Sequence, residues 1–171
     1  VTVDDAIAAV EGEQPLEADE KTWAEIIGYR QAMTYVLQLA KDPHFVYSSD
    51  IVRSLHYMML SHELAKGPGQ WRPGYIYVRD EERDEIVYEG PDAGEVPKLM
   101  SELIEALNLE DGQDLIVRGA MAHLNLVMIH PFRDGNGRMA RALQTLVLAR
   151  GGHVSPVFSS IEEYLGRNTK A

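Results

Sequence analysis

The sequence predicts a mainly α-helical protein that carries one β-hairpin. Apolar residues recur at helical spacing through most of the chain, as between Trp23 and Leu37 and between Leu115 and Met128. Residues 75–78 are instead a short run of Tyr, Ile and Val, which is typical of a β-strand. A chain of 171 residues is long enough for one core, so we expect a single domain over 1–171.

Residues that start and stop helices place the individual elements. We expect helices over 3–11, 18–41, 48–65, 95–107, 112–130, 136–150 and 160–166, and strands over 75–78 and 86–88. Ser48 and Ser49 are typical N-terminal helix residues, and the pair Gly151-Gly152 is typical of a helix end. Because two strands alone are marginally stable, the hairpin at 75–88 must pack on the helices.

Composition excludes several classes of function. The net charge is −11, which disfavours nucleic acid and anionic membranes as partners. The chain has no cysteine, so disulfides, thiolate zinc sites and cysteine nucleophiles are excluded. No apolar run approaches the roughly 18 residues that span a bilayer. No secretory signal is visible, so we expect a cytoplasmic protein.

Residues 130–141, which we call the signature segment, contain a predicted anion-binding turn. Pro131 indicates that a helix ends near His130, and a turn containing Gly135 and Gly137 follows. The next helix is expected to begin near Asn136. Backbone amides at a helix N-terminus bind anions, and glycine allows a phosphate to approach closely.

Side chains around this turn indicate phosphate chemistry. Arg138 and Arg141 are three residues apart, so they share a helix face and, with the turn amides, predict a polyphosphate ligand. Asp134 offers a carboxylate of the kind that holds Mg²⁺ beside phosphates. His130 is a candidate general base. Phe132 lies between polar neighbours and is expected to anchor the loop in the core.

A dinucleotide-binding fingerprint is the main alternative for this segment. Residues from Gly135 to Ala140 fit G-x-G-x-x-A, but that motif requires a strand that leads directly into its first glycine. Here Pro131, Arg133 and Asp134 intervene, and the pattern upstream is helical from residue 112 onward. We therefore favour the anion-binding turn.

The signature segment, His-Pro-Phe-Arg-Asp-Gly-Asn-Gly-Arg-Met-Ala-Arg, resembles the Fic family signature H-P-F-x-D-G-N-G-R-x-x-R at every defined position. Residues 69–103 look like the flap and following helix of that family, and residues 160–168 look like its closing helix. The resemblance covers most of the chain. It implies a helical bundle with a β-hairpin flap over the active site, in which 130–150 forms the signature loop and its helix.

The resemblance implies a protein adenylyltransferase that uses ATP and Mg²⁺. His130 would take the proton from a Tyr, Thr or Ser hydroxyl of a target protein, and Asp134 would hold the metal. Residues that would bind the ATP phosphates are Gly135, Asn136, Gly137, Arg138 and Arg141. Residues of the flap at 75–88 that would dock the target as an added strand are Tyr75, Ile76, Tyr77 and Val78.

Two other activities stay open. One is phosphotransfer with ATP reversed, as in the similar Doc toxins, although the full run from Gly135 to Arg138 favours AMP transfer. The other is a catalytically silent ATP-binding module that docks a partner through the flap. The presence of His130 and Asp134 argues against the silent module. The sequence also leaves self-association as a homo-oligomer open.

Residues 1–14 resemble an inhibitory helix that many Fic proteins carry, with the pattern [S/T]-x-x-x-E-[G/N]. Glu11 and Gly12 fit this pattern, whereas Ile7 replaces the expected Ser or Thr. The resemblance implies that Glu11 pairs with Arg141 and hinders productive ATP binding. The alternative is a helix that simply ends at Gly12, with Glu11 in solvent.

Replacing Glu11 with Gly tests the inhibitory segment. We expect Glu11→Gly to raise the rate of AMP transfer, because Arg141 would be released for the nucleotide. Mass spectrometry after incubation with ATP and Mg²⁺ measures the transfer, with Glu11→Gly/His130→Ala as the control. An unchanged rate in Glu11→Gly would assign residues 1–14 no inhibitory role.

Overall fold

The computed structural model describes residues 20–80, 84–109 and 112–153, and this part is mainly helical, as predicted. Its elements are α2 (Glu20–Lys41), α3 (Ser49–Leu60), the 3₁₀ helix η1 (Leu64–Lys66), β1 (Tyr77–Asp80), β2 (Glu85–Glu89), α4 (Val96–Asn108), α5 (Leu115–Ile129) and α6 (Asn136–Arg150). None of the described helices is both long and apolar enough to cross a bilayer. The predicted helices at 3–11 and 160–166, and Glu11 with them, lie outside the described residues.

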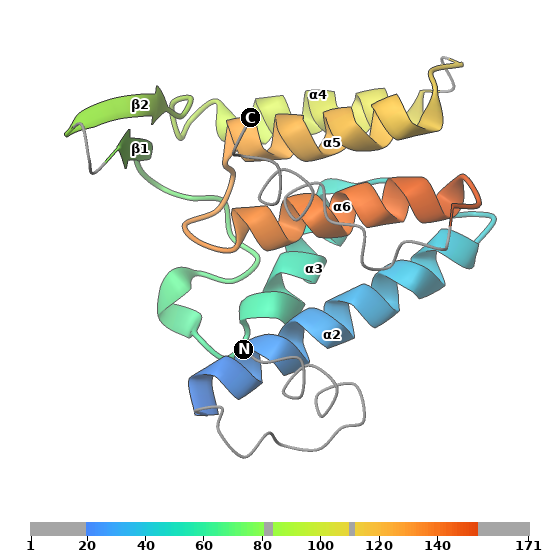
Figure 1. Ribbon diagram of the computed structural model, residues 1–171, viewed down its shortest axis with the longest axis horizontal. Coiled ribbons are helices and arrows are strands. Elements are labelled where there is room, and N and C mark those ends of the chain that lie inside the picture. The colour runs from blue at the N-terminus through green and yellow to red at the C-terminus, as the bar shows by residue number, and fades with distance from the viewer. Residues whose placement is uncertain (1–19, 81–83, 110–111, 154–171) are drawn as a thin grey trace, which may run out of the picture.

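Helix α6 is the centre of the bundle. It packs against α5 on one side and against α2 on the other, while α4 covers α5 and α3 covers α2 (Figure 1). Its central position explains its composition, because small and apolar side chains face neighbours on several sides. Its fully buried residues include Met139, Ala140, Leu143 and Leu146. The N-terminal end of α6, where the signature segment lies, is therefore held by the whole bundle.

Two helix boundaries differ from the prediction for local reasons. Helix α3 ends at Leu60 rather than at residue 65, and the separate turn η1 follows, closed by Gly67 in the left-handed conformation at φ 65°. Helix α5 begins at Leu115 rather than at 112, because the Asp114 side chain accepts hydrogen bonds from the amides of Ile116 and Val117.

The predicted hairpin is present, but its first strand is shifted. Strand β1 begins at Tyr77, so Tyr75 and Ile76 precede the strand instead of forming it. Pairing with β2 is antiparallel, and the register shifts between Val78 and Arg79. This irregularity is a β-bulge feature that short sequence patterns do not reveal. The Tyr88 hydroxyl donates a hydrogen bond to the Met128 carbonyl and so ties the hairpin to α5.

Helices α2 and α3 approach closely at Gly28. A Cβ atom at this position would lie 2.7 Å from the Met58 carbonyl oxygen and 2.9 Å from that of Met59. We expect Gly28→Ala to lower the free energy of unfolding by about 1–2 kcal/mol, because the clash outweighs the higher helix propensity of alanine. Thermal unfolding measures the change. The matched control is Gly94→Ala, since a Cβ there meets nothing within 4 Å, and equal melting temperatures for the two variants would contradict the close contact.

Candidate active site

Those residues singled out from the sequence that the structure describes lie at one end of the bundle. The hairpin, the loop between α5 and α6, and the turn η1 all lie at this end (Figure 1). His130 follows the last residue of α5, and Asn136 is the first residue of α6. The predicted turn between them is therefore short, and it brings the end of one helix next to the start of the other.

The turn is anchored by Phe132, whose side chain is completely buried as predicted. Its ring stacks on the imidazole of His56 from α3, with ring centroids 3.7 Å apart and planes inclined by 9°. The indole of Trp71 contacts the same ring at a centroid distance of 5.1 Å. This aromatic cluster fixes the loop to α3 and to the segment that leads into the hairpin.

His56 also joins these segments through hydrogen bonds. Its Nδ1 accepts a hydrogen bond of 2.8 Å from the Gly69 amide, so Nε2 carries the proton and donates to the Asp134 carbonyl at 2.9 Å. Burial lowers the pKa of this imidazole, in agreement with a neutral ring. The burial and contacts of His56 assign it a structural role.

The Asn136 side chain has a different task from the one expected. Its Oδ1 accepts a hydrogen bond from the Phe132 amide and its Nδ2 donates to the Phe132 carbonyl, both at 2.9 Å. Both polar groups of the side chain are thus used to close the loop. The amides of Asn136 and Gly137 remain candidates for anion binding, because the first N–H groups of a helix have no partner within it.

Gly135 is required by the geometry of the turn. Its φ is 75°, and a Cβ atom would lie 2.7 Å from the buried Leu60 side chain. Its amide donates a 2.6 Å hydrogen bond to Asp134 Oδ1. The Gly135 amide is therefore engaged by the Asp134 side chain, and its contact with a phosphate stays a prediction.

His130 is held in an unusual backbone conformation, with φ 50° and ψ 59°. Its amide donates to the Leu126 carbonyl at 2.9 Å and so closes the last turn of α5. Burial lowers the pKa of its imidazole, a hydrogen bond to the Val127 backbone raises it, and the nearby Arg72 charge lowers it, with a net decrease. The ring is therefore neutral at pH 7, which is the state required of a base.

Arg72 holds the backbone of His130 in place. Its Nε donates to the His130 carbonyl at 2.8 Å, and its two terminal nitrogens donate to the carbonyls of Gly74 and Pro91 at 2.6 and 2.5 Å. The Arg72 amide also donates to the Pro131 carbonyl at 2.8 Å. This buried arginine connects both ends of the hairpin to the turn between α5 and α6, and the sequence did not indicate this role.

Asp134 lies in a positive environment. Its Oδ2 pairs with the ammonium of Lys66, and its Oδ1 lies 3.9 Å from the Arg138 guanidinium. Burial raises the pKa of this carboxyl, but the Lys66 hydrogen bond, the Gly135 amide and the two positive charges together lower it below its ordinary value. Asp134 is consequently ionised at neutral pH and able to hold a cation.

Lys66 is a site residue that the sequence did not reveal. It lies in η1, 68 positions before Asp134, and nothing in its local pattern indicates the contact.

Arg138 lies between two carboxylates, because one of its terminal nitrogens lies 4.0 Å from a carboxylate oxygen of Glu25 in α2 and another lies 3.9 Å from Asp134 Oδ1. A terminal nitrogen of Arg141 lies 4.0 Å from the position that a Cβ of Gly137 would occupy. Both signature arginines therefore lie beside the first turn of α6.

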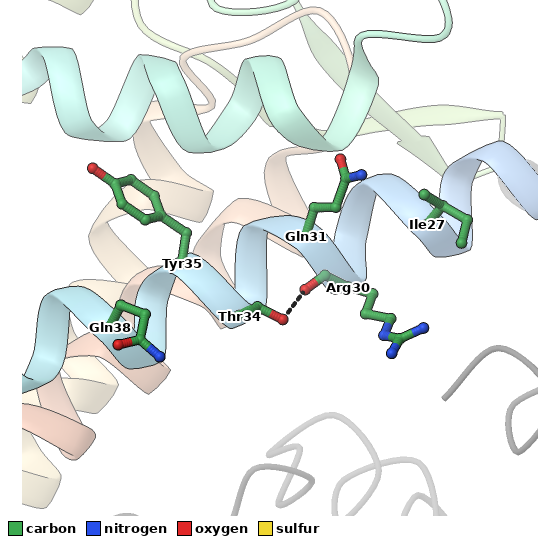
Figure 2. Close-up of a pocket in the computed structure, with 6 residues that line it drawn as sticks. All are labelled: Ile27, Arg30, Gln31, Thr34, Tyr35 and Gln38. Atoms are coloured by element: carbon green, nitrogen blue, oxygen red, sulfur yellow. Dashed lines mark hydrogen bonds between the residues drawn. The ribbon is translucent and has the colours of Figure 1, made fainter. Parts of the chain in front are cut away.

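A hollow on α2 is separate from this site. It is lined by Ile27, Arg30, Gln31, Thr34, Tyr35 and Gln38, all from α2 (Figure 2). The side chains drawn there belong to a single helix, and Thr34 donates a 2.9 Å hydrogen bond to the Arg30 carbonyl. The hollow contains no residue of the signature segment, so we assign the chemistry to the turn between α5 and α6.

A helical bundle with a histidine at the end of one helix, a glycine-containing turn into the next helix and a β-hairpin at the same end is the arrangement of Fic-type domains. The model of the Fic/DOC family matches residues 46–148, so this chain belongs to that family. It is 31% identical over 146 residues to protein adenylyltransferase fic-1 of Caenorhabditis briggsae, and 33% identical over 131 residues to protein adenylyltransferase Fic of Drosophila mojavensis. The alignments cover 82% and 75% of this chain but only 27% and 24% of those proteins. The chain thus spans about a quarter of the length of these curated relatives.

Solved structures show the same architecture. A Fic-domain-containing signaling protein from Bacteroides thetaiotaomicron superimposes with a TM-score of 0.82 at 26% identity, covering 89% of this chain and 57% of that one. Fic-1 from C. elegans gives a TM-score of 0.73 at 27% identity, covering 89% of this chain and 44% of that one. The fold predicted from the sequence is confirmed.

The ion pair of Lys66 with Asp134 makes a prediction about pH. We expect Lys66→Gln to raise the carboxyl pKa of Asp134 towards its ordinary value, as followed by an NMR titration of that carboxyl. A carboxyl with a depressed pKa stabilises the fold above its unfolded pKa and loses that contribution as the pH falls through its folded value. The stabilities of wild type and Lys66→Gln should therefore converge on acidification. Lys98→Gln, on the exposed side of α4, is the control, and an equal pKa in both variants would rule out the pair in solution.

Proposed function

We propose that this chain is the catalytic domain of a protein adenylyltransferase, formed as a single Fic-type domain. The observation that carries the proposal is the placement of His130 and the first turn of α6 on either side of one rigid turn. A neutral imidazole follows the end of α5, and the N-terminus of α6, with the Asp134 carboxylate, Arg138 and Arg141, begins six residues later. The names of the relatives, protein adenylyltransferases, support the same activity.

The α6 end supplies the binding site for the phosphates of ATP. The amides of Asn136 and Gly137 begin the helix and present their dipoles to an anion, and Gly137 has no side chain to block the approach. Arg138 and Arg141 would neutralise the β- and γ-phosphates. Because the loop is locked by Phe132 and Asn136, these donors need little rearrangement when the nucleotide binds.

His130 acts as the general base. Its neutral ring accepts the proton from a Tyr, Thr or Ser hydroxyl of the target, and the hydroxyl oxygen forms a bond to the α-phosphorus of ATP. The bond from that phosphorus to the bridging oxygen breaks, and pyrophosphate leaves with the electron pair. Arg72 holds the backbone carbonyl of His130, which fixes the point from which the imidazole extends towards the reacting groups.

Asp134 is the residue that would hold Mg²⁺. The ionised carboxylate fits a hard cation that prefers one or two carboxylates together with phosphate oxygens. When bound, Mg²⁺ would neutralise charge that develops on the phosphates. Lys66 contacts Asp134 Oδ2, so a cation that binds this oxygen would compete with the Lys66 ammonium for it.

The hairpin is the proposed docking site for the target. Within the described residues β1 pairs only with β2, so its other edge is open to an added strand. Tyr75 and Tyr77 are exposed there, and a hydrogen bond to Glu89 raises the pKa of Tyr75 to about 12. The docking contacts proposed for residues 75–78 therefore combine backbone pairing from Tyr77 onward with contacts made by the exposed side chains of Tyr75 and Tyr77.

The same site suits phosphotransfer if ATP binds in the reverse direction, which makes the transferred group the decisive measurement. Incubation with ATP, Mg²⁺ and cell lysate, followed by intact-protein and peptide mass spectrometry, should detect an adenylyl mass gain in the target or in the chain itself. We expect His130→Ala to reduce the transfer by at least about 100-fold, since general bases contribute about 10²–10⁴-fold.

His44→Ala is the control, because His44 is exposed and lies outside the signature segment and the hairpin. Glu11→Gly serves as the activated background, so that inhibition by residues 1–14 is not mistaken for inactivity. A phosphoryl mass gain would reassign the domain to the phosphotransferases. Transfer that persists in His130→Ala would show that another group is the base.

A further inference from the structure

A second cluster of charged and imidazole groups lies beside the active site, at the start of α2 and the end of α3. Glu25 belongs to α2, whereas His62 and Glu63 lie between α3 and η1. One nitrogen of His62 and one carboxylate oxygen from each glutamate lie within 4.8 Å of one another. None of these residues belongs to the signature segment, and the proposed reaction uses none of them.

We propose that Glu25, His62 and Glu63 form a binding site for a divalent transition-metal cation of the Zn²⁺ or Co²⁺ class. One imidazole and two carboxylates are a common ligand set for such ions, whereas Mg²⁺ prefers oxygen ligands alone. Donor atoms around a tetrahedral ion lie about 3.4 Å apart for bonds of about 2.1 Å. Donors within 4.8 Å therefore reach that geometry by small side-chain rotations.

An independent observation points to a missing ligand at His62. Its Nδ1 is buried, and among the described residues it has no hydrogen-bond partner. A buried polar atom without a partner is costly, because it has lost its hydration without compensation. A metal ion bound at Nδ1 would supply the partner that this atom lacks, and Nε2 would then keep the proton of the ring.

The existing ion pairs would yield easily to a metal ion. Glu63 lies 3.5 Å from the Lys21 ammonium, and Glu25 lies 4.0 Å from the Arg138 guanidinium. The carboxylates are 29% and 40% exposed, so an ion can reach them from solvent. At 4.0 Å the contact between Glu25 and Arg138 is too long for a hydrogen bond, so Glu25 loses little on turning towards a cation.

Occupancy of this site would affect its surroundings in two ways. It would join α2 to the segment between α3 and η1 through a shared ion, although the two are far apart in the sequence. It would also withdraw Glu25 from Arg138 and leave that guanidinium to the phosphates. The cluster is thus a metal site next to the proposed Mg²⁺ site but distinct from it, with Arg138 between the two.

Metal titration of the full, untagged chain without nucleotide tests the site. Zn²⁺ alone, followed by isothermal titration calorimetry, should bind at about one equivalent per chain, and Co²⁺ alone should develop visible d–d absorption bands. We expect His62→Asn and Glu63→Gln to weaken binding by about tenfold or more, since even outer-shell changes at metal sites cost about 10- to 100-fold. Mg²⁺ should not displace the bound Co²⁺.

Two variants distinguish this site from the proposed Mg²⁺ site and from surface binding through exposed imidazoles. Asp134→Asn removes the proposed Mg²⁺ ligand and should leave Zn²⁺ affinity unchanged, and His44→Asn should also bind as wild type. Circular dichroism without metal checks each fold, and Glu25→Gln provides the same test from another helix if His62→Asn unfolds. Affinity retained in both His62→Asn and Glu25→Gln, affinity lost only in Asp134→Asn, or no saturable binding in wild type would each overturn the proposal.

Discussion

The stack of His56 on Phe132 is the contact on which the geometry of the active site depends. The imidazole has a fixed tautomer, with one nitrogen on the Gly69 amide and the other on the Asp134 carbonyl. It therefore joins α3, the segment before the hairpin and the signature segment at one buried point. A protonated imidazole could no longer accept the hydrogen bond from the Gly69 amide at Nδ1. Burial lowers the pKa of the ring and keeps it neutral, and this preserves the contacts among the three segments.

Charge in the site is balanced before any nucleotide arrives. Asp134 is shared by Lys66 and Arg138, and Arg138 is shared in turn by Glu25. Such a chain of pairs lets an acidic protein present basic side chains to an anion without leaving them uncompensated. Binding of ATP with its cation would then exchange partners among charges already present, which requires less desolvation than forming new pairs.

Local patterns were sufficient to predict the helices of the described residues to within a few positions and the turn between α5 and α6, because periodicity and turn residues lie close together in the sequence. Sequence did not indicate Lys66 or the role of Arg72, since the contacts with Asp134 and His130 join residues 68 and 58 positions apart. The Asn136 side chain was expected to bind phosphate, whereas in the structure it forms hydrogen bonds with the Phe132 backbone. A sequence motif specifies which residue is present but not where its side chain points. Strand β1 begins two residues later than predicted, and its pairing with β2 is irregular between Val78 and Arg79. The apolar pattern of a short strand does not specify such a register shift.

Arg72 also bears on how related sequences should be recognised. Its guanidinium reaches the carbonyls of His130, Gly74 and Pro91 at once, and lysine has only a single ammonium with which to replace this planar fork. Substitution of Arg72 would thus remove hydrogen bonds from the turn that follows α5 and from both ends of the hairpin. In a survey of sequences, an arginine about 58 residues before the histidine would separate chains that can build the site from those in which the twelve-residue pattern occurs by chance.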